Sequence, residues 1–437
     1  MATRVPHRGL RRTGFRQVGR WALLAFFVLV VAPVGFGCQC HTASVKRAEQ
    51  KPVECPKPTE ANVEEVRQAA RQRANQFLEV VEYAPATLGP SKALAVLSYP
   101  RAEGSLGSRS FVYDDALALL WFAWSGQQAK ASGIAETLIY LQNPDGSWGF
   151  SFGTKYPADY HASYVRNGTV AWAAHALGYF GERYGQPRAI RAARRGADFL
   201  RRMRLGGNTL DRGLVSAGYN SASTPYDAPP GPTLQYAVTE HQFDAHFVLA
   251  RWEPSTAERL AERMNEVLWL DEEGRFAVAV ASDRLNDNRA LDAAGAWGAL
   301  WLLSTGERER AVQSYRYALD HFETDAGELY GFRPYEDSVD GYDPVQAPEH
   351  IFVEGTMSMG LAAHRLGDRD TAQKVVATGV ALSCRGENGL PYSNVEVPGF
   401  STRPAAASTI WFLFLDREMA TGQNAPVFES IVLDTTG

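Results

Sequence analysis

The chain has few cysteines and no excess of positive charge. Only 4 of its 437 residues are cysteine, and none shows the CxxC or Cys/His spacing that structural zinc sites use. The formal net charge of -5 argues against a nucleic-acid partner, which normally meets a basic face. The sequence therefore predicts no metal, no cofactor and no nucleic-acid partner. It leaves open whether Cys55 pairs with Cys384 or with Cys40.

The basic residues that are present gather near the N-terminus, ahead of an apolar run. Arginines between Arg4 and Arg20 precede WALLAFFVLVVAPVGFG at 21–37, which has the form of an export signal or a short membrane anchor. Cys38 ends a GFGC motif that resembles a bacterial lipoprotein attachment site, with Gly35 where that motif usually has leucine. The alternative is a conventional signal, cleaved or uncleaved, with incidental cysteines. Either way, we expect an exported, cell-envelope-associated protein, periplasmic or extracellular.

Composition divides the chain into four parts. We expect the signal or anchor segment at 1–37, a polar, proline-bearing linker at 38–60, one large domain at 61–422 and a C-terminal tail at 423–437. With 45% hydrophobic residues, the chain can build a large core. Its 10 Trp and 18 Tyr are common in proteins that stack sugars or other flat ligands.

Two kinds of helical segment alternate along the domain. One kind is apolar nearly all round and rich in Ala and Gly, which is typical of buried helices; these segments lie at 114–126, 168–181, 241–252, 291–306, 354–367 and 406–419. The other kind has a single apolar stripe and a charged face; these segments lie at 62–81, 128–142, 187–203, 255–270, 307–322 and 369–384. The alternation predicts an all-α (α/α)6 barrel of six inner and six outer helices. A linear solenoid is the rival, but it would expose one face of its inner row.

The connections between these helices differ in length. Links from inner to outer helices are short, whereas links from outer to inner helices are long and aromatic-rich, as at 143–167, 206–239 and 323–353. Loops beyond about 12 to 15 residues in a compact domain are usually functional or disordered. All the long links fall at the end of the barrel where inner helices begin. We predict that this end carries the active site.

Polar residues stand at or near the start of every inner helix. They are Tyr113, Asp114, Asp115, Arg166, Asn167, Glu240, His241, Asp244, Asp292, Glu354 and Ser408. Converging inner helices would bring them into one funnel on the barrel axis. Several carboxylates in an aromatic-walled funnel suit glycosidic bond cleavage, because one protonated carboxyl donates to the leaving oxygen while an ionised one activates water or attacks the anomeric carbon.

Each acid also has a purely structural interpretation. Acids in the first helical turn are favoured by the helix dipole alone. Glu354, in the segment IFVEGTMSMG, illustrates the conflict, because a helix N-terminus stabilises the ionised carboxylate. Only desolvation or a neighbouring carboxylate would keep it protonated near neutral pH. Asp114 and Asp115 are adjacent, so we expect one to enter the funnel and the other to cap or pair outward.

The motif LQNPDGSWG at 141–149 places Trp148 after an Asp-Gly turn. It resembles the QW motif of triterpene cyclases, but it occurs once, and the chain has no DxDD acid motif. The motif therefore supports a helical toroid and says little about terpenes. We favour a tight turn pinned by a packed Trp148, with a sugar-stacking role in the cleft as the alternative.

Several segments together resemble the bacterial six-hairpin glycosidase superfamily. They are YDDALALLWFAW, LQNPDGSWG, TEHQFDAHFVLA, LDAAGAWGALWLL, FVEGTMSMGLAAHRLGD and ASTIWFLFL, which span most of 62–420. The superfamily includes hydrolases, unsaturated-glucuronyl hydrolases, lyases and epimerases. In related hydrolases the acids act from inner-helix starts and neighbouring loops, which matches the positions of Asp114, Glu240, Asp292 and Glu354.

The leading functional hypothesis is an exported glycoside hydrolase that is attached to the membrane through its N-terminal segment. Glu354 or Glu240 would be the general acid, and Asp114 or Asp292 the base of an inverting reaction, in a monomer acting on a carbohydrate. Sugar-binding candidates are Tyr113, Asp115, Trp148, Arg166, Asn167, His241, Asp244 and Trp297. One alternative is a polysaccharide lyase or sugar epimerase acting on uronates, with a Tyr or His as base. Another is a glycan-binding lipoprotein without catalysis.

Overall fold

The computed structural model describes residues 62–83, 92–155, 160–221, 223–225, 228–339, 341–385 and 388–429. The predicted signal segment, the linker and the attachment candidate Cys38 lie outside the described residues. Within these ranges, no helix combines the length and the apolar character needed to cross a membrane.

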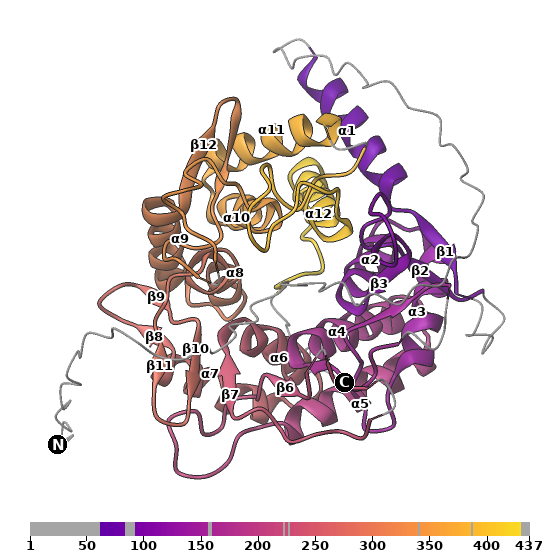
Figure 1. Cartoon of the computed structure of the whole chain (residues 1–437), viewed down its shortest axis with the longest axis vertical. Helices are drawn as coiled ribbons and strands as arrows, with labels where there is room; N and C mark the ends of the chain where they lie inside the picture. Colours follow the sequence, from indigo (N-terminus) through magenta and orange to yellow (C-terminus); the bar gives the residue numbers. More distant parts are fainter. Residues whose placement is uncertain are drawn as a thin grey trace, which may run out of the picture.

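Six inner helices form a closed ring. They are α2 (Val112–Trp124), α4 (Asn167–Arg183), α6 (Thr239–Trp252), α8 (Trp297–Ser304), α10 (Val353–Leu366) and α12 (Ala406–Thr421). Each inner helix contacts the next, and α12 contacts α2, so the ring visible in Figure 1 is complete. All thirteen residues of α2 are buried, as an apolar helix inside a double ring requires. The (α/α)6 barrel is therefore confirmed, and the linear solenoid is wrong.

Six amphipathic helices form the outer layer. They are α1 (Val63–Phe77), α3 (Gln128–Leu141), α5 (Pro187–Arg202), α7 (Pro254–Val267), α9 (Arg308–Phe322) and α11 (Arg369–Arg385). Five of them follow an inner helix and pack against it, whereas α1 closes the outer layer against α11 and α12. Arg67 and Arg71 of α1 both pair with the buried Asp416 of α12. This ion-pair cluster fixes the beginning of the domain to its last helix.

The long outer-to-inner links form short antiparallel strand pairs. The pairs are β1 (Val80–Glu82) with β2 (Leu94–Val96), β3 (Arg109–Phe111) with β4 (Ser151–Gly153), β5 (Val165–Arg166) with β6 (Gly218–Tyr219), β8 (Trp269–Leu270) with β9 (Arg275–Phe276), and β12 (Glu323–Ala326) with β13 (Leu329–Phe332). A three-stranded sheet joins β11 (Leu285–Asn286), β10 (Ala279–Ala281) and β7 (Tyr236–Val238).

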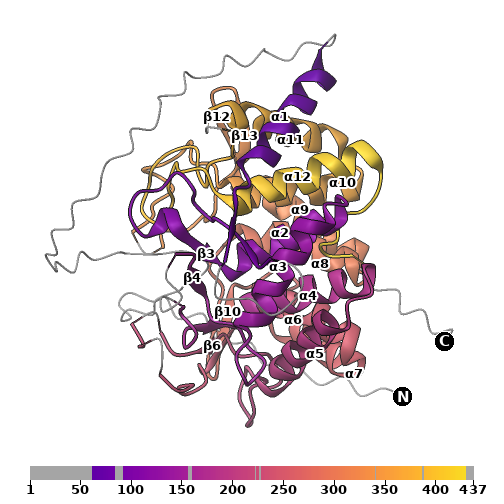
Figure 2. The same ribbon diagram turned by 90° about the vertical axis from the view of Figure 1, so that its right-hand side faces the viewer.

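These strands position the starts of the inner helices. β3, β5 and β7 run directly into α2, α4 and α6, so the first residues of those helices are fixed by strand pairing. Figure 2, a side view of the ring, shows most strand pairs and long links gathered toward its left side. The sequence predicted this asymmetry of the links but not their pairing into strands.

The C-terminal segment crosses the barrel after α12, as the last yellow stretch in Figure 1 shows. Ala425, Val427 and Phe428 are buried, and the Phe428 ring lies 4.7 Å from the ring of Phe247 and 6.1 Å from that of Trp172. The domain thus continues past the boundary predicted at 422, at least to Glu429. Nothing in the polar sequence TGQN at 421–424 signalled that an apolar plug would follow.

Candidate active site

A pocket lies where three inner helices begin. Its walls are made by Glu240, Ala290, Asp292, Trp297, Pro334, Tyr335, Phe352, Glu354, Tyr392 and Phe400. Three of the predicted catalytic acids thus meet in one cavity: Glu240 from α6, Glu354 from α10 and Asp292 from the turn before α8. Trp297, predicted to contact sugar, also lines it.

Glu354 is held by residues from two other inner helices. The Tyr113 hydroxyl of α2 donates a hydrogen bond to Glu354 Oε1 over 2.6 Å, and the Trp411 indole of α12 donates to the Tyr113 oxygen over 3.0 Å. Burial raises the pKa of Glu354 to about 8, with a further rise from the nearby Asp292 and Asp114; the Tyr113 hydrogen bond acts in the opposite direction. Desolvation therefore outweighs the helix dipole at this position.

Glu240 and Asp292 form a second, mutually interacting pair. Burial raises the pKa of Glu240 to about 7, and the neighbouring Glu354 adds to this rise. Burial also raises the pKa of Asp292 well above its usual value, and the charge of Glu240 reinforces the shift. Because two close carboxylates resist ionising together, the pair holds one proton over a wide pH range.

Asp292 stands at the first residue of a single π-helical turn, η3 (Asp292–Ala296), which leads into α8. Such turns insert one extra residue into a helix and occur frequently at functional sites. The Asp292 Oδ1 atom is buried and has no hydrogen-bond partner among the described residues. An unpartnered buried carboxylate oxygen is costly, so it is available to a ligand hydroxyl.

Asp114 and Asp115 have different environments, as adjacent residues on a helix should. Asp115 accepts hydrogen bonds from the Val96 amide (2.8 Å) and the Ser110 hydroxyl (2.9 Å), so it ties the strands to α2. Burial raises the pKa of Asp114 to about 7, and Asp114 in turn raises the pKa of Glu354. Asp114 is therefore the one beside the funnel, although neither aspartate is among the pocket walls, and both oxygens of Asp115 are bonded within the fold.

Two further predicted sugar-binding residues serve the backbone instead. The buried Arg166 guanidinium donates to the carbonyls of Val165 (2.8 Å) and Asn220 (3.2 Å) and lies over the Tyr164 ring. The Asn167 amide donates to the Ser216 carbonyl over 2.5 Å. Both side chains fasten the β5–β6 pair to the start of α4, and neither lines the pocket.

Trp148 is a packing residue. It is fully buried, and its indole N–H donates to the Leu138 carbonyl over 2.7 Å. A Cβ placed on Gly196 of α5 would come within 2.9 Å of the Trp148 ring, so that glycine permits the close contact. This environment matches the packed tryptophan that the sequence favoured for LQNPDGSWG, and Trp148 is not among the walls of the main pocket.

His241 and Asp244 do not line the main pocket, and both side chains lie against Gly168 of α4. Burial, followed by the charge of Arg166, lowers the pKa of His241 to about 3, so its ring is neutral at ordinary pH. Asp244 lines a second cavity together with Trp172 and Phe428. Burial, with Glu240 as the next cause, raises the pKa of Asp244 well above its usual value. Asp244 is thus close enough to Glu240 to interact with it, but it lines a different cavity.

Sequence reasoning missed the aromatic wall of the pocket. Tyr392 and Phe400 stack with centroids 5.5 Å apart and planes 11° apart, and Phe352 lies edge-on to both. Tyr335 faces Phe400 from another link, at 6.3 Å. The aromatic richness of the long links was the available signal, but it did not identify which rings converge.

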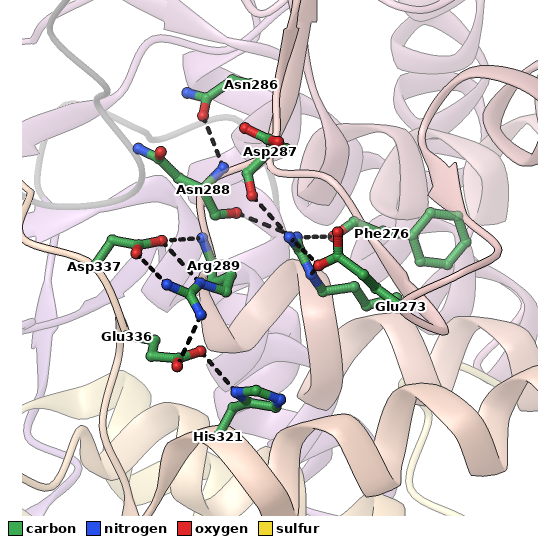
Figure 3. A network of polar contacts seen from close by, with 10 residues as sticks. Glu273, Phe276, Asn286, Asp287, Asn288, Arg289, His321, Glu336 and Asp337 are labelled. Carbon is green, nitrogen blue, oxygen red and sulfur yellow. Dashed lines mark hydrogen bonds and ion pairs between the residues drawn. The ribbon is translucent and has the colours of Figure 1, made fainter. Parts of the chain in front are cut away.

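A polar network, shown in Figure 3, surrounds Arg289, the residue before the pocket residue Ala290. Arg289 pairs with Asp337 over 2.6 Å and with Glu336 over 2.8 Å, and His321 of α9 contacts the other oxygen of Glu336 over 2.9 Å. Ala290 and Tyr335 pair as an isolated β-bridge in the same region. The network therefore binds together the two segments that carry Asp292 and Tyr335.

No group of three or more His, Cys, Asp or Glu side chains within the described ranges is arranged to hold a metal ion. The chemistry available at the pocket is that of carboxyl groups with raised pKa values between aromatic rings. Such groups can donate and accept protons near neutral pH, and the rings can stack on a sugar face.

Comparison with known proteins finds similarity in structure only. No protein-family model matches the sequence, and no curated protein matches it significantly. Among solved structures, a D-mannose isomerase matches with a TM-score of 0.57 and 11% identity, covering 86% of this chain and 100% of that one. The cellobiose 2-epimerase of Bacillus thermoamylovorans matches with a TM-score of 0.57 and 10% identity, covering 81% and 100%.

A glycoside hydrolase is also among the similar structures. The family 76 glycoside hydrolase from a bovine Bacteroides thetaiotaomicron strain matches with a TM-score of 0.54 and 10% identity, covering 81% of this chain and 77% of that one. At such low identity these matches establish a shared fold. They do not establish which reaction this chain catalyses.

Proposed function

Because the chain has the (α/α)6-barrel fold of the six-hairpin glycosidase superfamily, we propose that it is a glycoside hydrolase acting on a polysaccharide or oligosaccharide. The observation that carries this proposal is the convergence of Glu240, Asp292 and Glu354 in one aromatic-walled pocket. Hydrolysis of a glycosidic bond needs a protonated and an ionised carboxyl group on either side of the anomeric carbon.

The proposed roles follow from the pKa values. Glu354, with a pKa of about 8, keeps its proton at neutral pH and acts as general acid toward the leaving oxygen. Glu240, with a pKa of about 7, acts as the base that activates water in an inverting reaction. Asp292, whose buried Oδ1 atom has no partner among the described residues, binds a sugar hydroxyl. Trp297 and the Tyr392–Phe400 stack hold the ring.

A narrow, bell-shaped pH profile is the first expected consequence. The base must be ionised, so kcat/KM falls as the pH drops through about 7, the pKa of Glu240. The acid must be protonated, so kcat/KM also falls as the pH rises through about 8, the pKa of Glu354. Measuring kcat/KM across pH on one substrate gives the free-enzyme values. A maximum near pH 5, where both groups would be protonated, would contradict the assignment.

Tyr113→Phe should move the alkaline limb of that profile upward. The Tyr113 hydroxyl donates to ionised Glu354 and so lowers its pKa; without it, Glu354 keeps its proton to higher pH. The acidic limb should stay in place. Tyr315→Phe is the matched control, because that hydroxyl bonds Asp368 on the outside of the barrel. An alkaline limb that stays fixed in Tyr113→Phe would mean that Glu354 is not the titrating acid.

A second candidate function is sugar epimerisation or isomerisation. It is favoured by the similar structures named as a D-mannose isomerase and a cellobiose 2-epimerase. In this chain, His350 lies beside the pocket residue Phe400, at 4.8 Å between ring centroids, and burial lowers its pKa to about 4. A neutral imidazole of this kind can accept a proton from carbon. Elimination from a uronate polymer is the third possibility.

The test is a product analysis of the full chain incubated with neutral, amino and uronic-acid glycans. Hydrolysis predicts new reducing ends without ultraviolet absorbance. Elimination would give absorbing unsaturated products, and epimerisation would give a new sugar without chain shortening. Binding without turnover of any glycan would support a non-catalytic glycan-binding protein and overturn the hydrolase.

We also propose that the enzyme works outside the cytoplasm, attached to the envelope through the N-terminal segment. Support comes from the basic and apolar segment before Cys38 and from Cys384, which is disulfide-bonded. Disulfides persist in oxidising compartments and are rare in the cytosol. Fractionation of cells with and without Cys38→Ala tests the attachment, since loss of the lipid site would release the protein from membranes.

A further inference from the structure

The pocket walls contain acids but no compensating cation. Of the ten residues that line it, three are carboxylic acids and seven are uncharged, so no Lys, Arg or His faces the cavity from the described residues. Asp114 and Asp244, 2% and 3% exposed, add two more buried carboxyl groups next to these walls. Buried acids are normally paired with a cation or coordinate one.

Four basic residues lie in the surrounding segments, and none of them lines the pocket. Arg166 donates through Nη1 to three backbone carbonyls, and His241 is neutral because burial, followed by the charge of Arg166, lowers its pKa to about 3. Arg403 is exposed and hydrogen-bonds Ser401. Arg333 acts on Tyr342 and His350 rather than on the acids. Consistently, the raised pKa of Glu240 traces to burial and the charge of Glu354, and that of Asp292 to burial and the charge of Glu240, with no lowering by a cation.

We propose that this pocket is selective for sugars carrying a free amino group, accepts neutral sugars more weakly and rejects uronates. An ammonium group would supply the positive charge that the Glu240, Asp292 and Glu354 set lacks. A uronate would instead bring one more carboxylate into a site where carboxyl groups already suppress each other's ionisation. The inference rests on the proposed glycosidase function, because it assumes that the pocket binds a sugar.

Binding of an amino sugar should also release a proton from the pocket. An ammonium beside Glu240 and Glu354 favours their ionised forms, so binding at neutral pH should expel a proton from one of them. A neutral sugar lacks this effect. All the sugars can stack on Tyr392 and Phe400, so stacking should contribute similarly to each affinity. Differences in affinity should then reflect the charge of the sugar.

The experiment compares the affinities of methyl glycosides by titration calorimetry with the full chain at pH 7. The set consists of a hexosamine glycoside, its N-acetylated form, the parent hexoside and the corresponding uronate, in the gluco, galacto and manno series. N-acetylation is the matched ligand control, since it removes the charge and leaves the nitrogen in place. The expected preference is at least ~10-fold for amine over neutral and again ~10-fold for neutral over uronate, as one charge pair at intermediate dielectric implies. The measured enthalpy of binding the amino sugar should also vary with the ionisation enthalpy of the buffer, because the buffer takes up the released proton.

Two variants locate the effect. Glu240→Gln should reduce the preference for the amine, whereas Asp198→Asn, on the exposed face of α5, should leave it unchanged. Equal affinity for the amine and its N-acetylated form, tighter binding of the uronate, or no binding of any of these sugars would overturn the proposal. The two proposals can be rejected independently. Hydrolysis of neutral glycans without a preference for amines would reject only the charge selectivity. Amine-selective binding without turnover of any glycan would reject only the hydrolase activity.

Discussion

Glu354→Gln should lower kcat on a natural glycoside by roughly 10²- to 10⁴-fold, the usual contribution of a positioned general acid. The substitution keeps the shape of the side chain and one oxygen to accept the Tyr113 hydroxyl, but it removes the proton that the leaving oxygen needs. The pocket and its aromatic wall should remain, so KM should change far less than kcat. Burial of the wild-type carboxyl makes this proton available near neutral pH.

Leaving-group dependence separates this role from a general loss of structure. The dinitrophenolate group of a dinitrophenyl glycoside leaves without being protonated. Glu354→Gln should therefore retain most of its activity on that substrate and lose its activity on an alkyl glycoside. Glu349→Gln, an exposed glutamate five residues earlier, is the matched control and should behave as wild type. Full activity of Glu354→Gln on the alkyl glycoside, with loss in Glu240→Gln, would transfer the acid role to Glu240.

Arg365→Ala should give the largest loss of stability of any single substitution considered. The Arg365 guanidinium donates two hydrogen bonds, of 2.9 and 2.8 Å, to the Glu418 carboxylate of α12. It also donates to the carbonyls of Val427 and Phe428, at 2.9 and 3.0 Å. Removing it leaves the Glu418 charge buried at 1% exposure and frees the C-terminal plug. Breaking one side of a buried ion pair costs about 3 to 5 kcal/mol.

Denaturant unfolding of the full chain measures this loss through the free energy of unfolding. Arg308→Ala is the matched control, because the Arg308 side chain is a surface donor to the Leu366 carbonyl, and it should cost about 0.5 kcal/mol or less. The double variant Arg365→Ala with Glu418→Gln should recover part of the loss, since it removes the orphaned charge. A cost below about 1 kcal/mol for Arg365→Ala would show that the plug is not anchored through this arginine.

The barrel itself was predictable because its inner and outer helices differ in their pattern of apolar residues, which can be read directly from the sequence. The run DDALALLWFAW is apolar all round and becomes α2, whereas PRAIRAARRGADFLRRM has one apolar stripe and becomes α5. Polar residues at inner-helix starts stood out against that apolar background, which is why Glu240, Asp292 and Glu354 were found. Their convergence followed from closing the ring.

The remaining features depended on contacts that sequence position does not encode. Arg166 and Asp115 had the same sequence signature as the pocket acids, but Arg166 Nη1 donates to backbone carbonyls and both Asp115 oxygens accept hydrogen bonds within the fold. The Tyr392–Phe400 stack arises from the folding of one long link, and Phe428 reaches the barrel from beyond the last helix. The single π-helical turn at Asp292 has no local sequence signal, since it depends on packing around the helix.

The most direct test of the central claim is a proton NMR time course of the wild-type reaction on a glycan substrate in D₂O. We expect new reducing-end anomeric signals, with the inverted anomer appearing first and every carbon-bound proton of the sugar retained. Inversion is expected if Glu240 activates water rather than attacking the anomeric carbon. Disappearance of a carbon-bound proton signal without new reducing ends would instead establish proton transfer at carbon, and it would replace the hydrolase with an epimerase or isomerase.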